Sequence, residues 1–384
     1  MTRSVITSAV RTPVGKFGGA LRSCEAVDLG AVAIREAVAR AGVEPGEIDH
    51  VVMGHVVQAG TGQISSRQAA VAAGVPKEVP AITLNNVCLS SLTAIAYADQ
   101  LIRLGEIETA VAGGMESMTN APYLMRRARW GGRLGDFEVV DAMIHDGLWS
   151  TFTGQHMGES SDEVNAELGI AREEQDVWAA RSHQRAADAR DSGRAGEEIV
   201  PLEVLEQDEG IRPETTADSL AQLPPAFGDG GTITAGNASQ LSDGAAAVTV
   251  MSAERAESLG IEPLAEIVAS GMCAERFAYL HTVPAIALRN ALDKAGLDVA
   301  DLGVVEINEA FASVAVHATR MLGLSEDIVN VNGNSVALGH ALGSTGARMA
   351  VTLVHEMRRR GVEYGAATLC GGGGQGYALV LRLH

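Results

Sequence analysis

Short runs of β-branched and other apolar residues alternate with alanine-rich amphipathic stretches along much of the chain. The first series runs from SVITSAV at residues 4–10 through DLGAVAIREAVARAG at 28–42 to IDHVVMGHVV at 48–57. The apolar runs have the length of strands, and the alanine-rich stretches repeat their apolar residues at the three- and four-residue spacing of helices. This alternation predicts βαβ units packed in layers of sheet and helix, an α/β fold.

A second series of the same kind begins at Pro263. It runs from PLAEIVASG through VPAIALRNALDKAG at residues 283–296 and VVEINEAF at 304–311 to a run of glycines near the end of the chain. The two series predict a duplicated architecture in which each half contributes its own strands and helices.

The segment between the two series has a different composition. Residues 119–240 are richer in charge and contain loop signals such as RWGGRLGD, LPPAFGDGG and AGNASQ. We therefore expect an inserted loop domain at 119–240. The N-terminal half then comprises 1–118 and 241–262, and the C-terminal half 263–384.

Composition narrows the class of protein. The 384 residues are 46% hydrophobic, which suffices for one large or two medium cores. No apolar run approaches the roughly 20 residues that cross a bilayer, and the N-terminus MTRSVITSAV lacks the features of a signal peptide. We expect a cytoplasmic protein that does not bind membranes.

Charge argues against nucleic acid as a partner. The formal net charge is −19, and no sustained basic stretch compensates for it. The local run MRRARWGGR at residues 125–133 has two interpretations: it attracts an anionic ligand or an acidic neighbour, or it is a solvated surface segment.

The cysteines indicate reduced thiols. Cys24, Cys88, Cys273 and Cys370 lie far apart and form no CxxC pair. This spacing suggests neither a dense disulfide framework nor a zinc site, and we expect no metal.

Cys88 is the first candidate for chemistry. It follows the apolar run AITL and precedes a helical pattern with Leu92, Ile95 and Leu101, so we expect it at a strand-to-helix junction. Amide groups and the helix dipole at such a junction would lower the thiol pKa from about 8.5 and favour the nucleophilic thiolate. The alternative is a small buried hydrophobic residue.

Three further residues are candidates. His340 lies in a glycine-spaced turn before a long helical pattern, where a neutral imidazole can take a proton from a thiol or donate to an oxyanion. Asn308 follows the short apolar run VVEI and is either a polar site residue or a helix cap. Cys370 precedes four glycines, which allow close backbone approach and present N–H groups to a ligand.

Together these segments resemble the thiolase family along the whole chain. The four principal matches are N-x-x-C-x-S-G at residues 85–91, N-E-A-F at 308–311, G-H-P-x-G-x-S-G at 339–346 and C-x-G-G-G-x-G at 370–376. Further matches are GGMESM at 113–118, HMG at 156–158, TAGNAS at 234–239 and DGAAA at 243–247. The resemblance implies a thiolase-like fold: two duplicated βαβαβαββ halves in a layered α-β-α-β-α arrangement with an inserted loop domain.

The resemblance also implies a mechanism. Cys88 would be the acylated nucleophile, His340 its activating base, and Cys370 the acid/base for the α-proton of the second substrate. One oxyanion site would combine His340 with a water held by Asn308, and the other the backbone N–H groups of Cys88 and Gly372. The expected reaction is the reversible condensation of two acetyl-CoA molecules to acetoacetyl-CoA and CoA, or the thiolysis of 3-ketoacyl-CoA.

Coenzyme A would enter as substrate and product, with no other cofactor. The family pattern matches Arg212 and Ser219 to contacts with the nucleotide end, and His156, Met157 and Ser239 to the pantetheine arm. Phe311, the last residue of N-E-A-F, belongs to the same substrate site. Plain surface roles remain open for Arg212 and Ser219. Thiolases form tight dimers, often paired into tetramers, so we expect a homodimer or homotetramer.

The chain departs from the family pattern at several positions. Ser91 replaces a glycine of the nucleophile motif, and Ala341 and Thr345 replace the proline and serine of the histidine motif. Leu280 and His281 stand where the family usually has a Met-Gly pair that borders the acyl pocket. We therefore expect His281 with Leu280 to shape that pocket and to favour short acyl chains.

Three alternatives stay open. The nearest is a longer-chain 3-ketoacyl-CoA thiolase. A ketoacyl synthase also uses an acylated cysteine, but such enzymes lack a second acid/base cysteine before a glycine run, so Cys370 argues against it. A non-catalytic acyl-CoA or lipid carrier on the same scaffold would have no need for all three reacting side chains.

Overall fold

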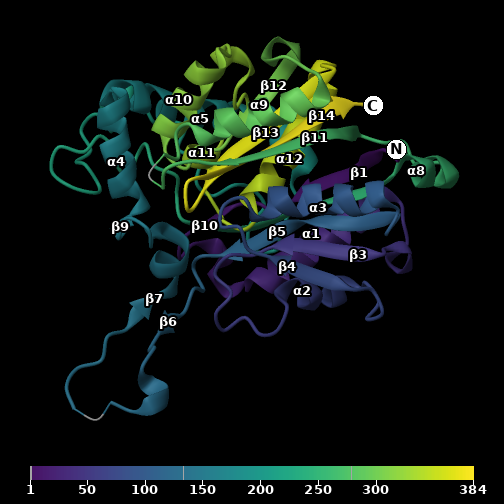
Figure 1. The fold of residues 1–384 in the computed structure, drawn as a ribbon, viewed down its shortest axis with the longest axis horizontal. Helices are drawn as coiled ribbons and strands as arrows, with labels where there is room; N and C mark the ends of the chain where they lie inside the picture. Colours follow the sequence, from purple (N-terminus) through teal and green to yellow (C-terminus); the bar gives the residue numbers. More distant parts are fainter. Residues whose placement is uncertain (1, 133, 278) are drawn as a thin grey trace.

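Two copies of one βαβαβαββ unit form the body of the molecule (Figure 1). The computed structural model describes residues 2–132, 134–277 and 279–384. The first unit is β1 (Ser4–Arg11), α1 (Ala26–Ala41), β3 (His50–Gly54), α2 (Ser65–Ala73), β4 (Ala81–Leu84), α3 (Ser90–Leu104), β5 (Thr109–Ser117) and β10 (Ser242–Ser252). The second is β11 (Ala265–Ala274), α9 (Val283–Ala295), β12 (Leu302–Ile307), α10 (Ala312–Leu322), α12 (Thr345–Arg360), β13 (Tyr364–Gly371) and β14 (Gln375–Leu383). In the second unit, a single bridge between Val305 and Val329 stands in the place of β4. The predicted duplication is confirmed.

The strands of the two units are joined along one seam. Over the described residues the order is β12-β13-β14-β11-β1-β10-β5-β3-β4, and the short β2 (Gly15–Lys16) also pairs with β10. β3 pairs in parallel with β4 and β5, as β12 does with β13. The seam between β1 and β11 consists of the pairs Val5↔Glu266 and Ile6↔Ala265. The strands thus form one continuous ten-stranded sheet. We refer to the parts that the two units contribute, which meet over this short contact, as the first and the second sheet.

Five layers result from the way the helices cover these sheets. α3 and α12 contact each other and lie between the two sheets, whereas α1 and α2 cover the outer face of the first sheet and α9 and α10 that of the second. A central helix must be apolar on more than one side, and α12 accordingly buries Met349, Leu353 and Met357 completely. The expected α-β-α-β-α arrangement is confirmed.

The segment between β5 and β10 forms a separate group of elements. They are β6 (Tyr123–Leu124), β7 (Val140–Asp141), β8 (Trp149–Ser150), β9 (Gln155–His156), α4 (Met157–Leu168), α5 (Arg172–Asp191), α6 (Arg194–Glu198) and α7 (Ala217–Leu220). Buried Arg11 of β1 fastens this segment to the first sheet through ion pairs with Glu198 and Asp208, each at 2.7 Å. Loss of one partner of such a buried pair costs about 3–5 kcal/mol.

The described residues of the segment 123–141 form an arm that projects from the body (Figure 1). The arm contains the basic segment 125–133, of which Arg133 lies outside the described residues. Within the described parts of the chain, none of the helices has the length and apolar character required to span a membrane. All four cysteines are free thiols.

Candidate active site

Cys88 lies in the connection between β4 and α3, as expected from the sequence. The preceding Val87 has a φ of 48°, a left-handed conformation that costs a non-glycine residue about 1–2 kcal/mol. Ser90 holds this tight turn: its hydroxyl accepts from the Asn86 amide at 2.8 Å and donates to the Val87 carbonyl at 2.6 Å. The turn places the Cys88 thiol at the start of a central helix.

His340 occupies the corresponding position in the second unit. It lies between the short helix α11 (Ser335–Leu338) and α12, as the glycine-spaced turn predicted. Thr345 Oγ1 lies 2.8 Å from His340 Nδ1 and donates its own hydrogen to the Ala341 carbonyl at 2.9 Å. Because the hydroxyl has one hydrogen, Nδ1 must donate to it, and the lone pair is then on Nε2. This tautomer can act as a base through Nε2.

The two central helices bring these residues together. Cys88 precedes α3, His340 precedes α12, and the Ala347 amide of α12 donates to Ser91 Oγ of α3 at 2.9 Å. Ser91 and Thr345, two of the departures from the family pattern, therefore support the geometry around the reacting side chains.

Cys370 reaches the same region from the end of β13. A Cβ on Gly371 would lie 2.5 Å from Leu89 Cγ, so only glycine lets this hairpin pack so closely on the Cys88 segment. The backbone N–H of the next residue, Gly372, acts to lower the pKa of the Cys88 thiol. Cys370 itself packs in an apolar cluster with Leu280 and Phe311.

Asn308 directly follows β12 and is fully buried. Its Nδ2 lies 3.5 Å from His340 Nε2. The alternative that Asn308 caps a helix is wrong, because α10 starts four residues later with Phe311 as its N-cap.

Burial determines the protonation of the three reacting groups. It raises the pKa of Cys88 to about 12, reinforced by the charge of Glu116, while the N–H groups of Cys88 and Gly372 act in the opposite direction. It lowers the pKa of His340 to about 3, and the charge of Arg348 adds to this. It also raises the pKa of Cys370, which the Cys88 sulfur raises further. The expected low pKa of Cys88 is therefore wrong: loss of water outweighs the helix terminus.

A cavity of about 270 Å³ opens onto Cys88 and His340. Its walls are mostly apolar and comprise Met143, Ile144, Gly147, Leu148, His156, Met157, Phe227, Ala238, Ser239, Leu241, Ala310, Phe311 and Leu342. The His156 ring stacks on Phe227 with centroids 4.7 Å apart, and Phe227 meets Phe311 edge-on at 6.2 Å. Four of the predicted substrate-binding residues thus line the same cavity: His156, Met157, Ser239 and Phe311.

Arg212 and Ser219 lie outside this cavity, on the exposed surface of the inserted segment. Arg212 contacts Gln240 Oε1 at 3.4 Å, and Gln240 directly follows the cavity residue Ser239. The Ser219 hydroxyl donates at 2.8 Å to the carbonyl of Thr216, the N-cap of α7. Arg212 is thus connected to the cavity wall, whereas the contacts of Ser219 are local.

Neither His281 nor Leu280 lines the cavity. Leu280 packs in the apolar cluster that contains Cys370 and Phe311, whereas the side chain of His281 points away from the predicted pocket. His281 has no exposed surface, and its Nε2 lies 2.8 Å from Asn165 Oδ1 and 3.0 Å from Ser313 Oγ. Burial lowers the pKa of His281 to about 3, so the ring is neutral. It connects α4 to α10 behind the wall.

Replacing His281 with alanine is expected to reduce stability and to leave acyl chain-length preference unchanged. The variant would leave Asn165 and Ser313 without their buried partner, at a cost of about 1–3 kcal/mol. Thermal denaturation and a series of 3-ketoacyl-CoA substrates measure the two effects. Met157→Ala, which enlarges the cavity itself, is the comparison variant. A shift of His281→Ala toward longer chains would contradict this placement.

His55 and Glu116 form a buried pair that sequence reasoning missed. The two residues occupy positions equivalent to site residues of the second unit. His55 directly follows β3, as Asn308 directly follows β12, and Glu116 in β5 corresponds by strand register to Cys370 in β13. His55 Nε2 lies 3.3 Å from Glu116 Oε1. Glu116 Oε2 also accepts from the Gly343 amide at 2.9 Å, in the loop that carries His340. The sequence contained a signal for Glu116: the GGMESM match to the family, aligned with the second half of the duplicated fold, puts this residue at the position of Cys370.

Comparisons with known proteins agree along the whole chain. Residues 4–254 match the family model described as "Thiolase, N-terminal domain", and 261–383 match "Thiolase, C-terminal domain". A probable acetyl-CoA acetyltransferase of Mycobacterium leprae is 50% identical, with 100% of both chains covered. The acetyl-CoA acetyltransferase of Pseudomonas aeruginosa is 47% identical, with 98% of each covered. The crystal structure of the Bacillus anthracis acetyl-CoA acetyltransferase has a TM-score of 0.98 at 42% identity, covering 100% of this chain and 99% of that one.

Proposed function

The chain belongs to the thiolase family, and we propose that it is an acetyl-CoA C-acetyltransferase that condenses two acetyl-CoA molecules reversibly to acetoacetyl-CoA and CoA. The observation that carries this proposal is the convergence of Cys88 and His340 on one apolar cavity. Cys370 does not line this cavity but belongs to the buried apolar cluster that contains the cavity residue Phe311. Acyl-CoA and CoA are its substrates and products, with no separate cofactor.

The first half-reaction starts from neutral groups. At neutral pH the Cys88 thiol keeps its proton and His340 is unprotonated, because burial disfavours both ions. The Cys88 sulfur attacks the thioester carbonyl of acetyl-CoA while His340 Nε2 takes the thiol proton. The C–S bond to CoA then breaks, and the Cys370 thiol gives its proton to the departing CoA sulfur. This leaves Cys370 as the thiolate, with the thiol proton of Cys88 held on His340. The N–H groups of Cys88 and Gly372 stabilise the oxyanion, each donor contributing about 3 kcal/mol.

The second half-reaction uses Cys370. Its thiolate, formed when Cys370 protonated the departing CoA, takes the α-proton of the second acetyl-CoA, and the resulting carbanion attacks the acetyl group on Cys88. His340, with a water held by Asn308, stabilises the enolate oxygen. As acetoacetyl-CoA forms, the Cys88–acyl bond breaks and the departing Cys88 sulfur regains its proton from His340. The α-proton of the substrate restores the Cys370 thiol, so all three groups return to their starting protonation.

Coenzyme A binding is assigned to the inserted segment. His156, Met157 and Ser239 line the cavity and would contact the pantetheine arm. Exposed Arg212, connected to the cavity wall through Gln240, would attract the phosphates of the nucleotide end. Ser219 is assigned there only by its match to the family pattern.

The expected test result is one acetyl group on Cys88 after brief incubation with acetyl-CoA. The reason is that Cys88 is the thiol that lines the cavity together with a base. Intact mass and peptide mapping locate the label. Cys88→Ala should lose it, and a label that persists in this variant or maps to another residue would overturn the assignment of the nucleophile.

The other readings of the sequence receive less support. Relatives that match over the full chain carry the name acetyl-CoA acetyltransferase. A carrier would bind acetoacetyl-CoA without consuming it when CoA is added, which thioester absorbance detects directly. A ketoacyl synthase would have no role for a second acid/base cysteine such as Cys370.

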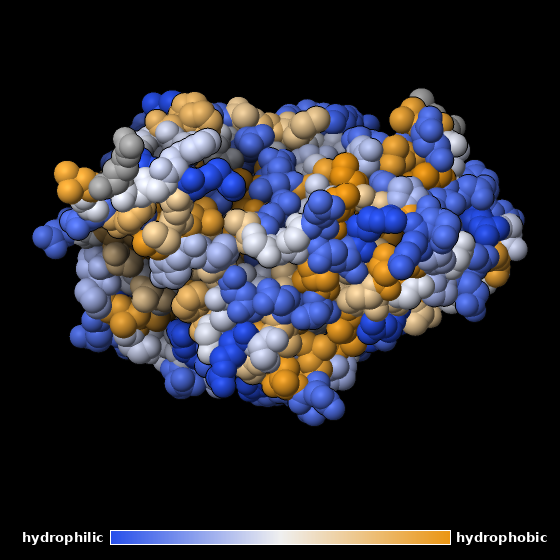
Figure 2. All heavy atoms as spheres, turned by 90° about the horizontal axis from the view of Figure 1, so that it is seen from below, coloured by the Kyte–Doolittle hydropathy of each residue, from blue (hydrophilic) through white to orange (hydrophobic). Residues whose placement is uncertain are grey.

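We further propose that the protein works in the cytoplasm as a homodimer or homotetramer. β4 is an edge strand of the sheet, and such an edge is available to pair with another chain. The arm at 123–141 exposes large apolar side chains, including Trp130 at 84% and Leu134 at 100%. Figure 2, which views the molecule from below, shows hydrophobic residues interspersed with hydrophilic ones on this face. Burial of the arm against another subunit would remove its apolar surface from water.

A further inference from the structure

The orientation of the Asn308 side chain decides what it presents to the cavity. An amide that turns its NH2 group toward His340 can donate to a water or an oxyanion, whereas the flipped amide presents an acceptor. The oxygen and nitrogen of an amide are distinguished by their hydrogen-bond partners. On the side away from His340, Asn308 Oδ1 lies 2.6 Å from Ser335 Oγ, the first residue of α11.

The direction of this hydrogen bond follows from Arg348. The guanidinium of Arg348 donates to Ser335 Oγ at 3.1 Å, and because arginine has no acceptor, Ser335 must accept this bond. The single hydrogen of the serine hydroxyl is then free to be donated elsewhere. Two oxygens are within reach: Asn308 Oδ1 at 2.6 Å and Asn334 Oδ1 at 3.1 Å.

Asn334 Oδ1 is already occupied. It accepts from the Ser335 backbone amide at 2.7 Å and from the Arg348 guanidinium, which together use both of its lone pairs. Asn308 Oδ1, in contrast, has Ser335 as its one donor among the residues that the structure describes. The serine hydrogen therefore goes to Asn308.

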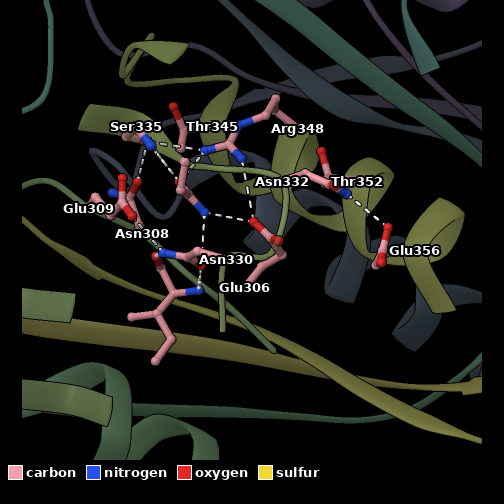
Figure 3. A network of polar contacts seen from close by, with 12 residues as sticks. Glu306, Asn308, Glu309, Asn330, Asn332, Ser335, Thr345, Arg348, Thr352 and Glu356 are labelled. Atoms are coloured by element: carbon pink, nitrogen blue, oxygen red, sulfur yellow. Dashed lines mark hydrogen bonds and ion pairs between the residues drawn. The ribbon is translucent and has the colours of Figure 1, made fainter. Parts of the chain in front are cut away.

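The position of Arg348 is in turn fixed by contacts with Glu306. Its guanidinium lies 3.6 Å from Glu306 Oε2, which also accepts from Asn334 Nδ2 at 2.7 Å. Figure 3 shows Arg348 extending from α12 toward Ser335 and Glu306, with Asn308 beyond Ser335. Arg348 and Ser335 are at most 3% exposed, so bulk water does not compete for these bonds.

We propose that Ser335 is a positioning residue that fixes the carboxamide of Asn308 with its NH2 group toward His340 and the cavity, in an order of donors that starts at Arg348. The inference rests on the proposed function, in which Asn308 holds the water of the enolate oxyanion site. His340 keeps its tautomer independently through Thr345. Ser335 therefore acts on the step that needs Asn308 and leaves the acetylation of Cys88 unaffected.

The test compares Ser335→Ala, Asn308→Ala and the double variant. Ser335→Ala should slow the exchange of acetyl-CoA methyl protons in heavy water, and kcat with it, by about tenfold. KM and the rate of Cys88 acetylation should stay within about twofold. If Ser335 works through Asn308, the double variant should be no slower than Asn308→Ala alone, because residues that act as one unit are not additive.

Ser8→Ala is the matched control. Ser8 is also buried and donates one hydroxyl hydrogen bond of 2.6 Å, to the Ala37 carbonyl between β1 and α1. Its loss should lower the melting temperature and leave the exchange rate unchanged. A Ser335→Ala variant that behaves like Ser8→Ala, or effects that multiply in the double variant, would overturn the inference alone. Full activity in Asn308→Ala would overturn the oxyanion assignment as well.

Discussion

Replacing Cys370 with serine is expected to slow removal of the α-proton by about 10²- to 10⁴-fold while Cys88 still accepts an acetyl group. A serine hydroxyl is a much weaker acid than a thiol, so it cannot provide the base that the second half-reaction requires. The variant keeps the size and the hydrogen-bonding capacity of the side chain. It therefore tests proton transfer rather than packing in the cluster with Leu280 and Phe311.

Deuterium exchange separates the two functions of the cysteines. In heavy water the unaltered enzyme should exchange the methyl protons of acetyl-CoA, and Cys370→Ser should acetylate Cys88 at a readily measured rate with hardly any exchange. Cys24→Ser is the control and should exchange normally, because Cys24 is a free cysteine that packs against the separate hydrophobic cluster containing Leu21 and Leu29. Exchange that survives in Cys370→Ser would mean that another base takes the proton.

Replacing His340 with glutamine is expected to slow both half-reactions, and acetylation of Cys88 by about 10²- to 10⁴-fold. The reason is the raised pKa of Cys88, about 12, which leaves almost no thiolate at neutral pH without a base to accept the proton. Stopped-flow measurement of CoA release in a single turnover reports this step. Rapid acetylation in His340→Gln would remove the imidazole from the activation of Cys88.

The pH dependence of Cys88 acetylation tests the role of His340 independently. Burial lowers the pKa of His340 to about 3, so the base is unprotonated above that pH and the acetylation rate should be flat from about pH 5 to about pH 9. In His340→Gln the residual rate should instead follow the Cys88 thiolate and rise about tenfold per pH unit, since the thiolate is the nucleophile. A decline of the unaltered enzyme below about pH 7 would contradict a neutral, buried imidazole.

Much of the fold was visible in the pattern of residues. Strand and helix alternation predicted the duplicated α/β units, since each period records which face of an element is buried. The glycine-spaced turn before His340 and the junction at Cys88 were likewise local features, and both lie where expected. Local sequence determines where a strand stops and a helix begins, so it located these two side chains along the chain.

Two expectations failed because they depended on surroundings that the chain supplies from far away. The pKa of Cys88 rises because segments distant in sequence, among them the hairpin after Cys370, exclude water from it. His281 was expected at the pocket from its position in a motif, yet its ring turns toward Asn165 and Ser313. Solvent exclusion and side-chain direction are properties of packing between elements, and neither is encoded by spacing along one segment.

The sequence by itself determined the identity of the reacting groups and the family, because nucleophile, base and glycine turns are short local patterns. Only the tertiary structure decided how those groups are supported. The buried pair of His55 and Glu116 and the order of donors from Arg348 through Ser335 to Asn308 join strands and helices that are distant in the chain. A hydrogen bond acquires its direction from every partner that surrounds it, and those partners meet only when the two halves of the chain pack against each other.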